Sequence, residues 1–133
     1  MKTHIFRLHP GDDLKQSLIE FAKQNRITAG YMVTCVGSLS TATLRLAKDL
    51  EVKTFADTFE IVSLVGTVSA TRTHLHIAVS DKMGTTIGGH LMDGCLIHTT
   101  AEIVLGEFDS LEYFKEPDKE TGFDELGIRQ IHD

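Results

Sequence analysis

The chain has 133 residues, 41% of them apolar and 24% charged, a balance typical of one globular domain and not of a disordered chain. It has no apolar run long enough to cross a bilayer and no apolar leader, so we expect a cytoplasmic protein with no membrane partner. The net charge of −6, with no run of basic residues, argues against DNA binding by this chain alone.

A short strand and an amphipathic helix are predicted first. His4–Leu8 alternates apolar and polar residues, as strands do. The chain then breaks at HPGDD, where Asp12 or Asp13 can cap a helix, because a short carboxylate accepts hydrogen bonds from the free N–H groups of the first turn. The helix is expected to run to about Asn25, because apolar side chains recur at helical spacing. These side chains are Leu14, Leu18, Phe21 and Ala22.

Strands are predicted for most of the chain that follows. The predicted segments are Ala29–Gly37, Thr41–Ala47, Thr58–Ala70, Thr73–Ser80 and Cys95–Phe108. The third is apolar at successive positions, which indicates a strand covered on both faces. One helix followed by about five strands predicts an α+β fold, a compact single domain with a mostly antiparallel β-sheet and one N-terminal helix packed on it. That helix covers one sheet face only, so we expect a homo-oligomer to cover the other.

The chain is expected to divide into a domain over residues 1–115 and an acidic C-terminal tail over residues 116–133. The tail contains Pro117 and many carboxylates, so we expect it to be extended or loosely ordered. Three apolar side chains, Phe123, Leu126 and Ile128, could dock it on the domain.

Three of the seven histidines lie in the segment THLHIAVSDKMGTTIGGHLMDG. Strand alternation places His74 and His76 on one face, and two imidazoles at this spacing can converge on one ion. The Met83-Gly84 turn sends the chain back, so that His90 can join them after two glycines, residues that allow close backbone approach and unusual torsions. The alternative is a solvent-facing pair that binds nothing.

We therefore predict a metal site of His74, His76 and His90. Three neutral imidazoles leave a fourth position open, and zinc is the default ion, with another divalent transition metal such as nickel, copper or cobalt as the alternative. No residue is assigned a catalytic or an organic cofactor-binding role. Glu102 and His98 are the best candidates for a general base, and Glu102 could also orient a liganding histidine. The alternative for Glu102 is a solvated sheet face or a subunit contact.

Other reactive residue types receive structural interpretations. Ser38 follows a glycine and is expected to be exposed enough for a nucleophile, but it lacks a G-x-S-x-G setting, which disfavours that role. Asp81 and Asp93 lie beside glycines and are expected to form turns. Cys35 and Cys95 occupy apolar surroundings and are predicted to be buried free thiols, and the terminal histidines are expected to be solvated. These histidines are His4, His9 and His132.

Several segments, in order, resemble one known family. FEIVSLVGTVS, HLHIAVSDKMGTTIGGHLMDG and AEIVLGEF, preceded by YMVTCVGSLSTATLRLA, are similar to the PPC (plants and prokaryotes conserved) domain. The similarity runs from about His4 to about Tyr113, and its most specific part is H-x-H followed by G-G-H, the pattern of the prokaryotic branch.

The resemblance implies a homotrimeric α+β fold and a metal site at the three histidines. Prokaryotic members are described as predicted DNA-binding proteins, which makes DNA an implied partner, although this chain has no R-G-R-P hook and no basic arm. Two functions follow as hypotheses. One is a trimeric, DNA-associated regulatory or binding module with a three-histidine metal site. The other is a small metal-dependent enzyme, in which a histidine-bound zinc activates water or a carbonyl. A structural trimer whose histidines bind nothing is a third interpretation.

Overall fold

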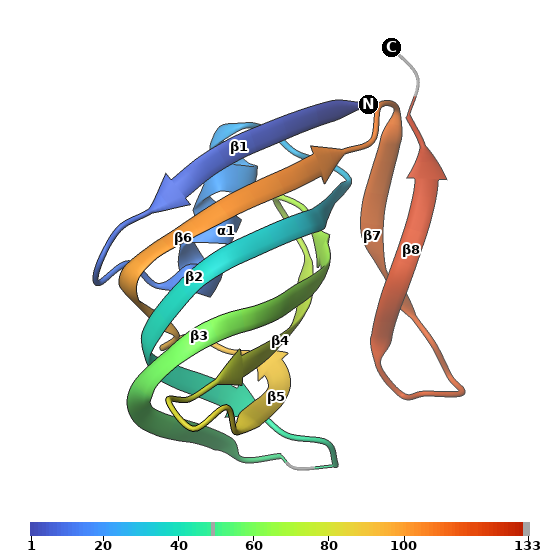
Figure 1. Cartoon of the computed structure of the whole chain (residues 1–133). Helices are drawn as coiled ribbons and strands as arrows, with labels where there is room; N and C mark the ends of the chain where they lie inside the picture. The colour runs from blue at the N-terminus through green and yellow to red at the C-terminus, as the bar shows by residue number, and fades with distance from the viewer. Residues whose placement is uncertain (49, 132–133) are drawn as a thin grey trace.

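The computed structural model describes residues 1–48 and 50–131, which form one large sheet, one helix and a separate hairpin (Figure 1). The elements are β1 (Lys2–Leu8), α1 (Leu14–Gln24), β2 (Gly30–Arg45), β3 (Val52–Val68), β4 (Thr73–Ser80), β5 (Thr86–Leu91), β6 (Leu96–Glu107), β7 (Leu111–Pro117) and β8 (Asp124–Gln130). The large sheet has the strand order β1-β6-β2-β3-β4-β5, and every pairing in it is antiparallel. The predicted α+β class and mostly antiparallel sheet are confirmed.

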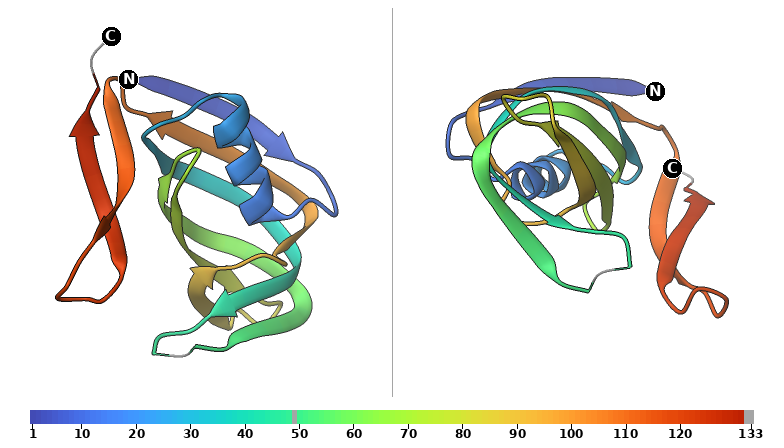
Figure 2. Two further views of the ribbon diagram at one scale, coloured as in Figure 1. Left: turned by 180° about the vertical axis from the view of Figure 1, so that it is seen from behind. Right: turned by 60° about the horizontal axis from the view of Figure 1, so that its bottom comes forward.

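The large sheet closes on itself around α1. The last residues of β2 leave β6 and pair with β5, Leu44 opposite Leu91 and Arg45 opposite His90. Irregular register within β2 and β3, the mark of β-bulges, accompanies the strong curvature. Figure 2 shows α1 lying inside the curve of the sheet. The strands that carry the histidines are therefore held on both sides by neighbouring strands.

Helix α1 forms as predicted and supplies the centre of the core. Asp13 is its N-cap, accepting a hydrogen bond from the backbone N–H of Gln16 at 3.0 Å. The Asp13 carboxylate also accepts from Gly94 N–H at 2.7 Å, which ties the start of the helix to the turn before β6. Leu14 and Leu18 are fully buried, as the helical spacing predicted.

Two strand predictions were wrong in their limits. The segments Ala29–Gly37 and Thr41–Ala47 are not separate strands, because β2 runs without interruption through Gly37. A methyl group at Gly37 would lie 2.0 Å from the carbonyl oxygen of Thr100, so this glycine permits close contact with β6 and does not end the strand. Strand β3 begins at Val52 and is not covered on both faces.

The outer face of the sheet carries exposed apolar side chains. Val62 and Val65 of β3 are 59% and 55% exposed, and Val33 and Val36 of β2 are exposed to the same degree. Their inward neighbours, such as Leu64, are buried. One sheet face is thus uncovered within the chain, as the sequence predicted.

The last described segment is a β-hairpin. Strands β7 and β8 pair from Leu111 opposite Gln130 to Pro117 opposite Asp124. The hairpin is joined to the domain through Thr28, whose backbone oxygen accepts from Tyr113 N–H at 2.9 Å. The tail is therefore paired up to Gln130 and not loosely ordered, while the boundary at residue 115 stays a prediction. Among the described residues, no helix has the length and apolar character needed to cross a membrane.

Candidate metal centre

Three histidine side chains converge on the outer face of β4 and β5. His76 and His90 are register partners across the two strands, and His74 precedes His76 by two residues on the same face. Their ring centroids are 4.3 Å apart for His76 and His90, and 5.2 and 5.3 Å for the pairs that include His74. One ring nitrogen from each lies within 4.8 Å of those of the other two. Leu75, the residue between the first two, is buried, as the predicted alternation requires.

The glycine pair before His90 brings three strands together. A methyl group at Gly89 would lie 2.7 Å from the carbonyl oxygen of Arg45, and one at Gly88 would lie 2.8 Å from that of Ile77. Glycine is thus required on both sides of β5. The expected close approach is present, but neither residue has a positive φ, so unusual torsions are not the reason.

Positive charge and burial keep two of the three imidazoles neutral. Burial is the main cause that lowers the pKa of His74 below its usual value of 6.5, followed by the charges of His76 and Arg72. Burial also lowers the pKa of His90, followed by the charges of His76 and Arg45. Neutral imidazole is the form that binds metal ions, so both groups are prepared for ligation at neutral pH.

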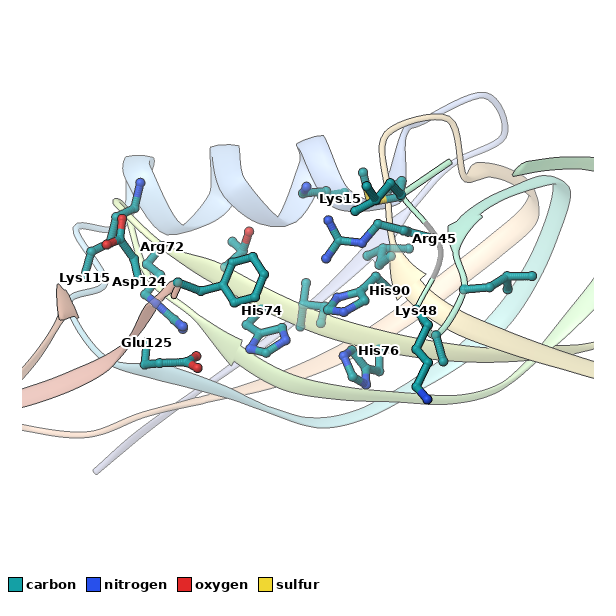
Figure 3. A pocket seen from close by; sticks show the side chains of 18 residues that line it. Lys15, Arg45, Lys48, Arg72, His74, His76, His90, Lys115, Asp124 and Glu125 are labelled. Carbon is teal, nitrogen blue, oxygen red and sulfur yellow. The ribbon is translucent and has the colours of Figure 1, made fainter. Parts of the chain in front are cut away.

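The three histidines line a pocket of about 860 Å³ (Figure 3). Its walls come from β4, β5, the end of β2, the start of α1 and the tip of the β7–β8 hairpin. Ten labelled side chains surround it, and besides the histidines they are Lys15, Arg45, Lys48, Arg72, Lys115, Asp124 and Glu125. His74 and His76 are exposed and His90 is half-buried, so water and solutes reach the three rings.

The candidate general bases lie elsewhere. Glu102 of β6 pairs with Val36 and Arg7, and β6 is separated from β4 by β2 and β3. Three strand spacings amount to about 14 Å, so Glu102 cannot orient a liganding histidine of its own chain. His98 is exposed on β6 and is not part of the cluster.

Several structural interpretations are confirmed. Asp81 accepts from the backbone N–H groups of Met83 and Thr85, which forms the turn between β4 and β5. Cys35 and Cys95 are buried free thiols.

Two expectations about exposure were wrong. Ser38 is buried, and its hydroxyl accepts from Thr99 N–H at 3.2 Å. His4 is not solvated, because its Nε2 lies 2.8 Å from a Glu107 carboxylate oxygen and its ring packs edge-on to Phe21. His9 is exposed as expected, and His132 lies outside the described residues.

The cationic residues of the pocket were missed in the sequence. Lys15 and Arg45 are far apart along the chain and show no local motif. Arg45 reaches His90 only because the end of β2 pairs with β5, a contact that strand periodicity does not predict. The available signal was strand alternation at Arg72, which precedes His74 by two residues and is therefore expected on the same face.

An antiparallel sheet closed around one helix, with H-x-H on one strand and a third histidine on the next, defines a small α+β domain with an open three-histidine centre. The chain belongs to the Plants and Prokaryotes Conserved domain family, abbreviated PCC or PPC, whose model matches residues 1–109. The Synechococcus sp. (strain JA-3-3Ab) bifunctional protein GlmU is 49% identical over 133 residues, covering 98% of this chain and 21% of that protein. The chain thus spans about a fifth of the length of the curated relatives it matches.

Solved structures share the whole fold. A hypothetical protein from Salmonella cholerae-suis superposes with a TM-score of 0.96 at 40% identity, covering 97% of this chain and 94% of that one. The metal-containing protein AF0104 from Archaeoglobus fulgidus gives a TM-score of 0.78 at 25% identity, with 95% and 93% covered. A candidate DNA-binding protein from Bacteroides thetaiotaomicron gives 0.83 at 22% identity, with 94% and 91% covered, which shows the fold alone.

Proposed function

We propose that this chain is a PPC-domain binding module that holds one divalent transition metal through His74, His76 and His90. The observation that carries the proposal is the convergence of three ring nitrogens within 4.8 Å of one another on one sheet face. A structural relative described as a metal-containing protein supports it.

The three residues fit a metal ion. Tetrahedral ligation with metal–nitrogen bonds of about 2.1 Å places the ligand nitrogens about 3.4 Å apart. Small side-chain rotations bring the three rings from their present separation to that spacing, because none is locked by another hydrogen bond among the described residues. Imidazole ligation favours zinc first, with nickel, copper or cobalt as alternatives. When bound, the ion would offer a Lewis-acidic position toward the pocket.

The module is proposed to be a homotrimer in which the outer sheet face is covered by other copies. Exposed valines on adjacent strands, Val33 and Val36 of β2 and Val62 and Val65 of β3, support this, because contiguous exposed apolar side chains mark interaction surfaces. A DNA-associated regulatory role is supported by the description of the Bacteroides relative and opposed by the net charge of −6. Binding to duplex DNA across a salt series tests that role.

A small metal-dependent enzyme is the second candidate function. The observation that favours it is the pocket, which opens directly beside the three imidazoles and has the volume of a small-molecule site. Glu125, at the start of β8, lines the same pocket as the three imidazoles and is the proton-transfer group that we propose for this function. A closed site with four protein ligands would contradict catalysis.

Metal analysis of protein purified without an affinity tag tests the metal site. We expect about one ion per chain in the wild type and in His98→Ala, a matched control that removes an exposed histidine outside the cluster. His76→Ala should lose the ion, with affinity falling by more than the roughly 10–100-fold that loss of an outer-shell partner costs. Equal metal content in all three proteins, or none in the wild type after zinc loading, would contradict the proposal.

A further inference from the structure

The pocket beside the histidines is positively charged in a negatively charged protein. Five cationic side chains line it, against two carboxylates at its rim, Asp124 and Glu125. The cations are Lys15, Arg45, Lys48, Arg72 and Lys115. The whole chain carries a net charge of −6, so the sign of the local charge is reversed at this place. A concave site lined by one sign of charge concentrates ligands of the opposite sign.

Arg72 carries a buried hydrogen-bond donor without a partner. Its Nη1 is inaccessible to solvent and makes no hydrogen bond in the described part of the chain. A buried polar group without a partner costs free energy, and more so for a charged group. Guanidinium presents its donors in a planar fork that matches the two oxygens of a carboxylate or phosphate. This donor is therefore available to an oxyanion on this side of His74.

Arg45 and Lys15 approach the histidines from the opposite side. Arg45 shares the sheet face of His90, because the two are register partners, and Figure 3 shows its guanidinium pointing over that ring with Lys15 beside it. The first turn of α1, which carries Lys15, is held to the turn before β6 by the Gln16 side-chain amide, which donates to Asp93 at 2.7 Å. Arg45, Lys15 and His90 all line the same pocket.

We propose that this pocket binds a small molecule with an oxyanion group, a phosphate or carboxylate, held by Arg72 on one side or by Arg45 and Lys15 on the other. The contact of such a ligand with a metal rests on the proposed metal site, but the contacts with the cations do not. Apolar side chains, among them Leu46, Leu91 and Met92, line the rest of the pocket and fit an apolar portion of the ligand.

A small anion fits these observations better than duplex DNA. The cations line a concave pocket and do not form an extended stripe, which a long polyanion would need. Successive phosphates of a duplex would also meet the rim carboxylates Asp124 and Glu125 and the net negative charge of the chain.

Titrations with two simple anions test the proposal. Sodium phosphate and sodium malonate are titrated separately into metal-free and zinc-loaded protein at constant ionic strength, with binding followed by calorimetry and zinc content measured independently. The variants are Arg72→Gln, Arg45→Gln and Lys15→Gln. The matched controls are Arg7→Gln on the exposed part of β1 and Lys23→Gln, on the same helix as Lys15 and outside the pocket. Circular dichroism and melting temperature verify that each variant is folded.

We expect saturable binding of at least one anion, weakened about tenfold or more by Arg72→Gln or by Arg45→Gln, because a hydrogen bond to a charged group contributes about 1.5–3 kcal/mol. The controls should change the affinity less than about twofold, as substitutions away from the site do. The relative affinities for phosphate and malonate identify whether the pocket prefers a phosphate or a carboxylate group. Loss of binding in the arginine variants of metal-free protein would support the proposal even if zinc uptake failed.

Other results would overturn it. Absence of saturable anion binding by protein shown to contain zinc would remove this inference and leave the metal site standing. Equal weakening by the controls would mean unspecific attraction. Binding in the zinc-loaded form alone, insensitive to the arginines, would make the anion a metal ligand only. Binding of a duplex oligonucleotide with no response to either small anion would assign the cations to DNA.

Discussion

His76 and His90 face each other across β4 and β5 with ring centroids 4.3 Å apart, although fourteen positions of chain separate them. The antiparallel register produces this contact, because opposed residues of such a pair place their side chains on the same face. His74 then joins from the same strand as His76. A metal ion bound by the three rings would connect the two strands, so its occupancy should affect the stability of the fold.

Zinc should raise the melting temperature of the protein. A ligand that binds only the folded state at a hundred times its Kd stabilises it by about 2.7 kcal/mol, or roughly 10 °C for a domain of this size. We expect this rise in melting temperature in the wild type and in His98→Ala, and we expect a chelator to reverse it. His90→Ala should show no rise. Calorimetry measures the melting temperature in each case. A gain of the same size in His90→Ala would mean that zinc binds elsewhere.

Metal retention should extend below the pH at which ordinary histidines protonate. Burial, together with nearby positive charge, lowers the pKa of His74 and His90 below 6.5, so both remain neutral ligands until the pH falls through these lowered values. Arg45→Gln removes a neighbouring cation, raises the pKa of His90 and should shift zinc release to higher pH. Zinc content after dialysis at graded pH measures this, and release at the same pH in both proteins would contradict it.

The metal-free protein should lose stability as the pH falls. His74 and His90 bind protons less tightly in the folded state than in the unfolded state, in which the pKa of a histidine is about 6.5. The unfolded state then takes up more protons below that value, which favours unfolding until the pH is below the folded-state pKa as well. Urea unfolding of chelator-treated protein between pH 8 and pH 5 tests this, and His74→Gln should reduce the slope.

Gly89→Ala should separate β5 from the end of β2. The added methyl would lie 2.7 Å from the backbone oxygen of Arg45, closer than real contacts allow, so the strands must shift. We expect a loss of about 1–3 kcal/mol in unfolding free energy and weaker zinc binding. Thr86→Ala, at an exposed position of the same strand, is the control and should change both little. Unaltered zinc affinity in Gly89→Ala would show that the strand shift does not reach His90.

Val36→Glu should disrupt the proposed homotrimer. Val36 is 59% exposed on the outer face, and its partner on the neighbouring strand β6 is Glu102. A carboxylate buried at position 36 by subunit contacts would therefore lie beside another carboxylate and would lack a partner of opposite charge there. Light scattering after size-exclusion chromatography should show a trimer for the wild type and for Met83→Glu, an exposed apolar residue of the β4–β5 turn, and monomers for Val36→Glu. A trimeric Val36→Glu protein would place the interface elsewhere.

The features of this fold that depend on local spacing of apolar residues were predicted better than those that depend on which strands pair. The apolar spacing from Leu14 to Ala22 gave the helix and its buried face, and alternation from His74 to Val79 gave the orientation of two histidines. Both sequence patterns depend only on residues that are close together along the chain, within a turn or two of a helix or a few residues of a strand. The single 16-residue β2 was missed because Gly37 resembles a strand end when the close approach of β6 is unknown.

Long-range partners decide what the sequence left open. Glu102 was a reasonable ligand partner by residue type, but strand order places it three strands from β4. Arg45 enters the pocket through the β2–β5 pairing, and Lys115 enters it through the approach of the hairpin, neither of which leaves a periodic signal. The segment of β8 was expected to be extended or loosely ordered because of its many carboxylates, and its pairing with β7, which includes the ion pair between Arg129 and Glu112, was not predicted.

The pairing of β1 with β6 has a consequence for how the chain acquires its structure. Lys2 lies opposite Glu107, so the first strand waits for residues synthesised about a hundred positions later. Such non-local topology slows folding, because the chain loses conformational entropy in closing a long loop before the paired strands gain any favourable contacts. During synthesis, β1 therefore remains without its partner strand until β6 has left the ribosome, and an unpaired strand of this kind is a site where nascent chains can aggregate.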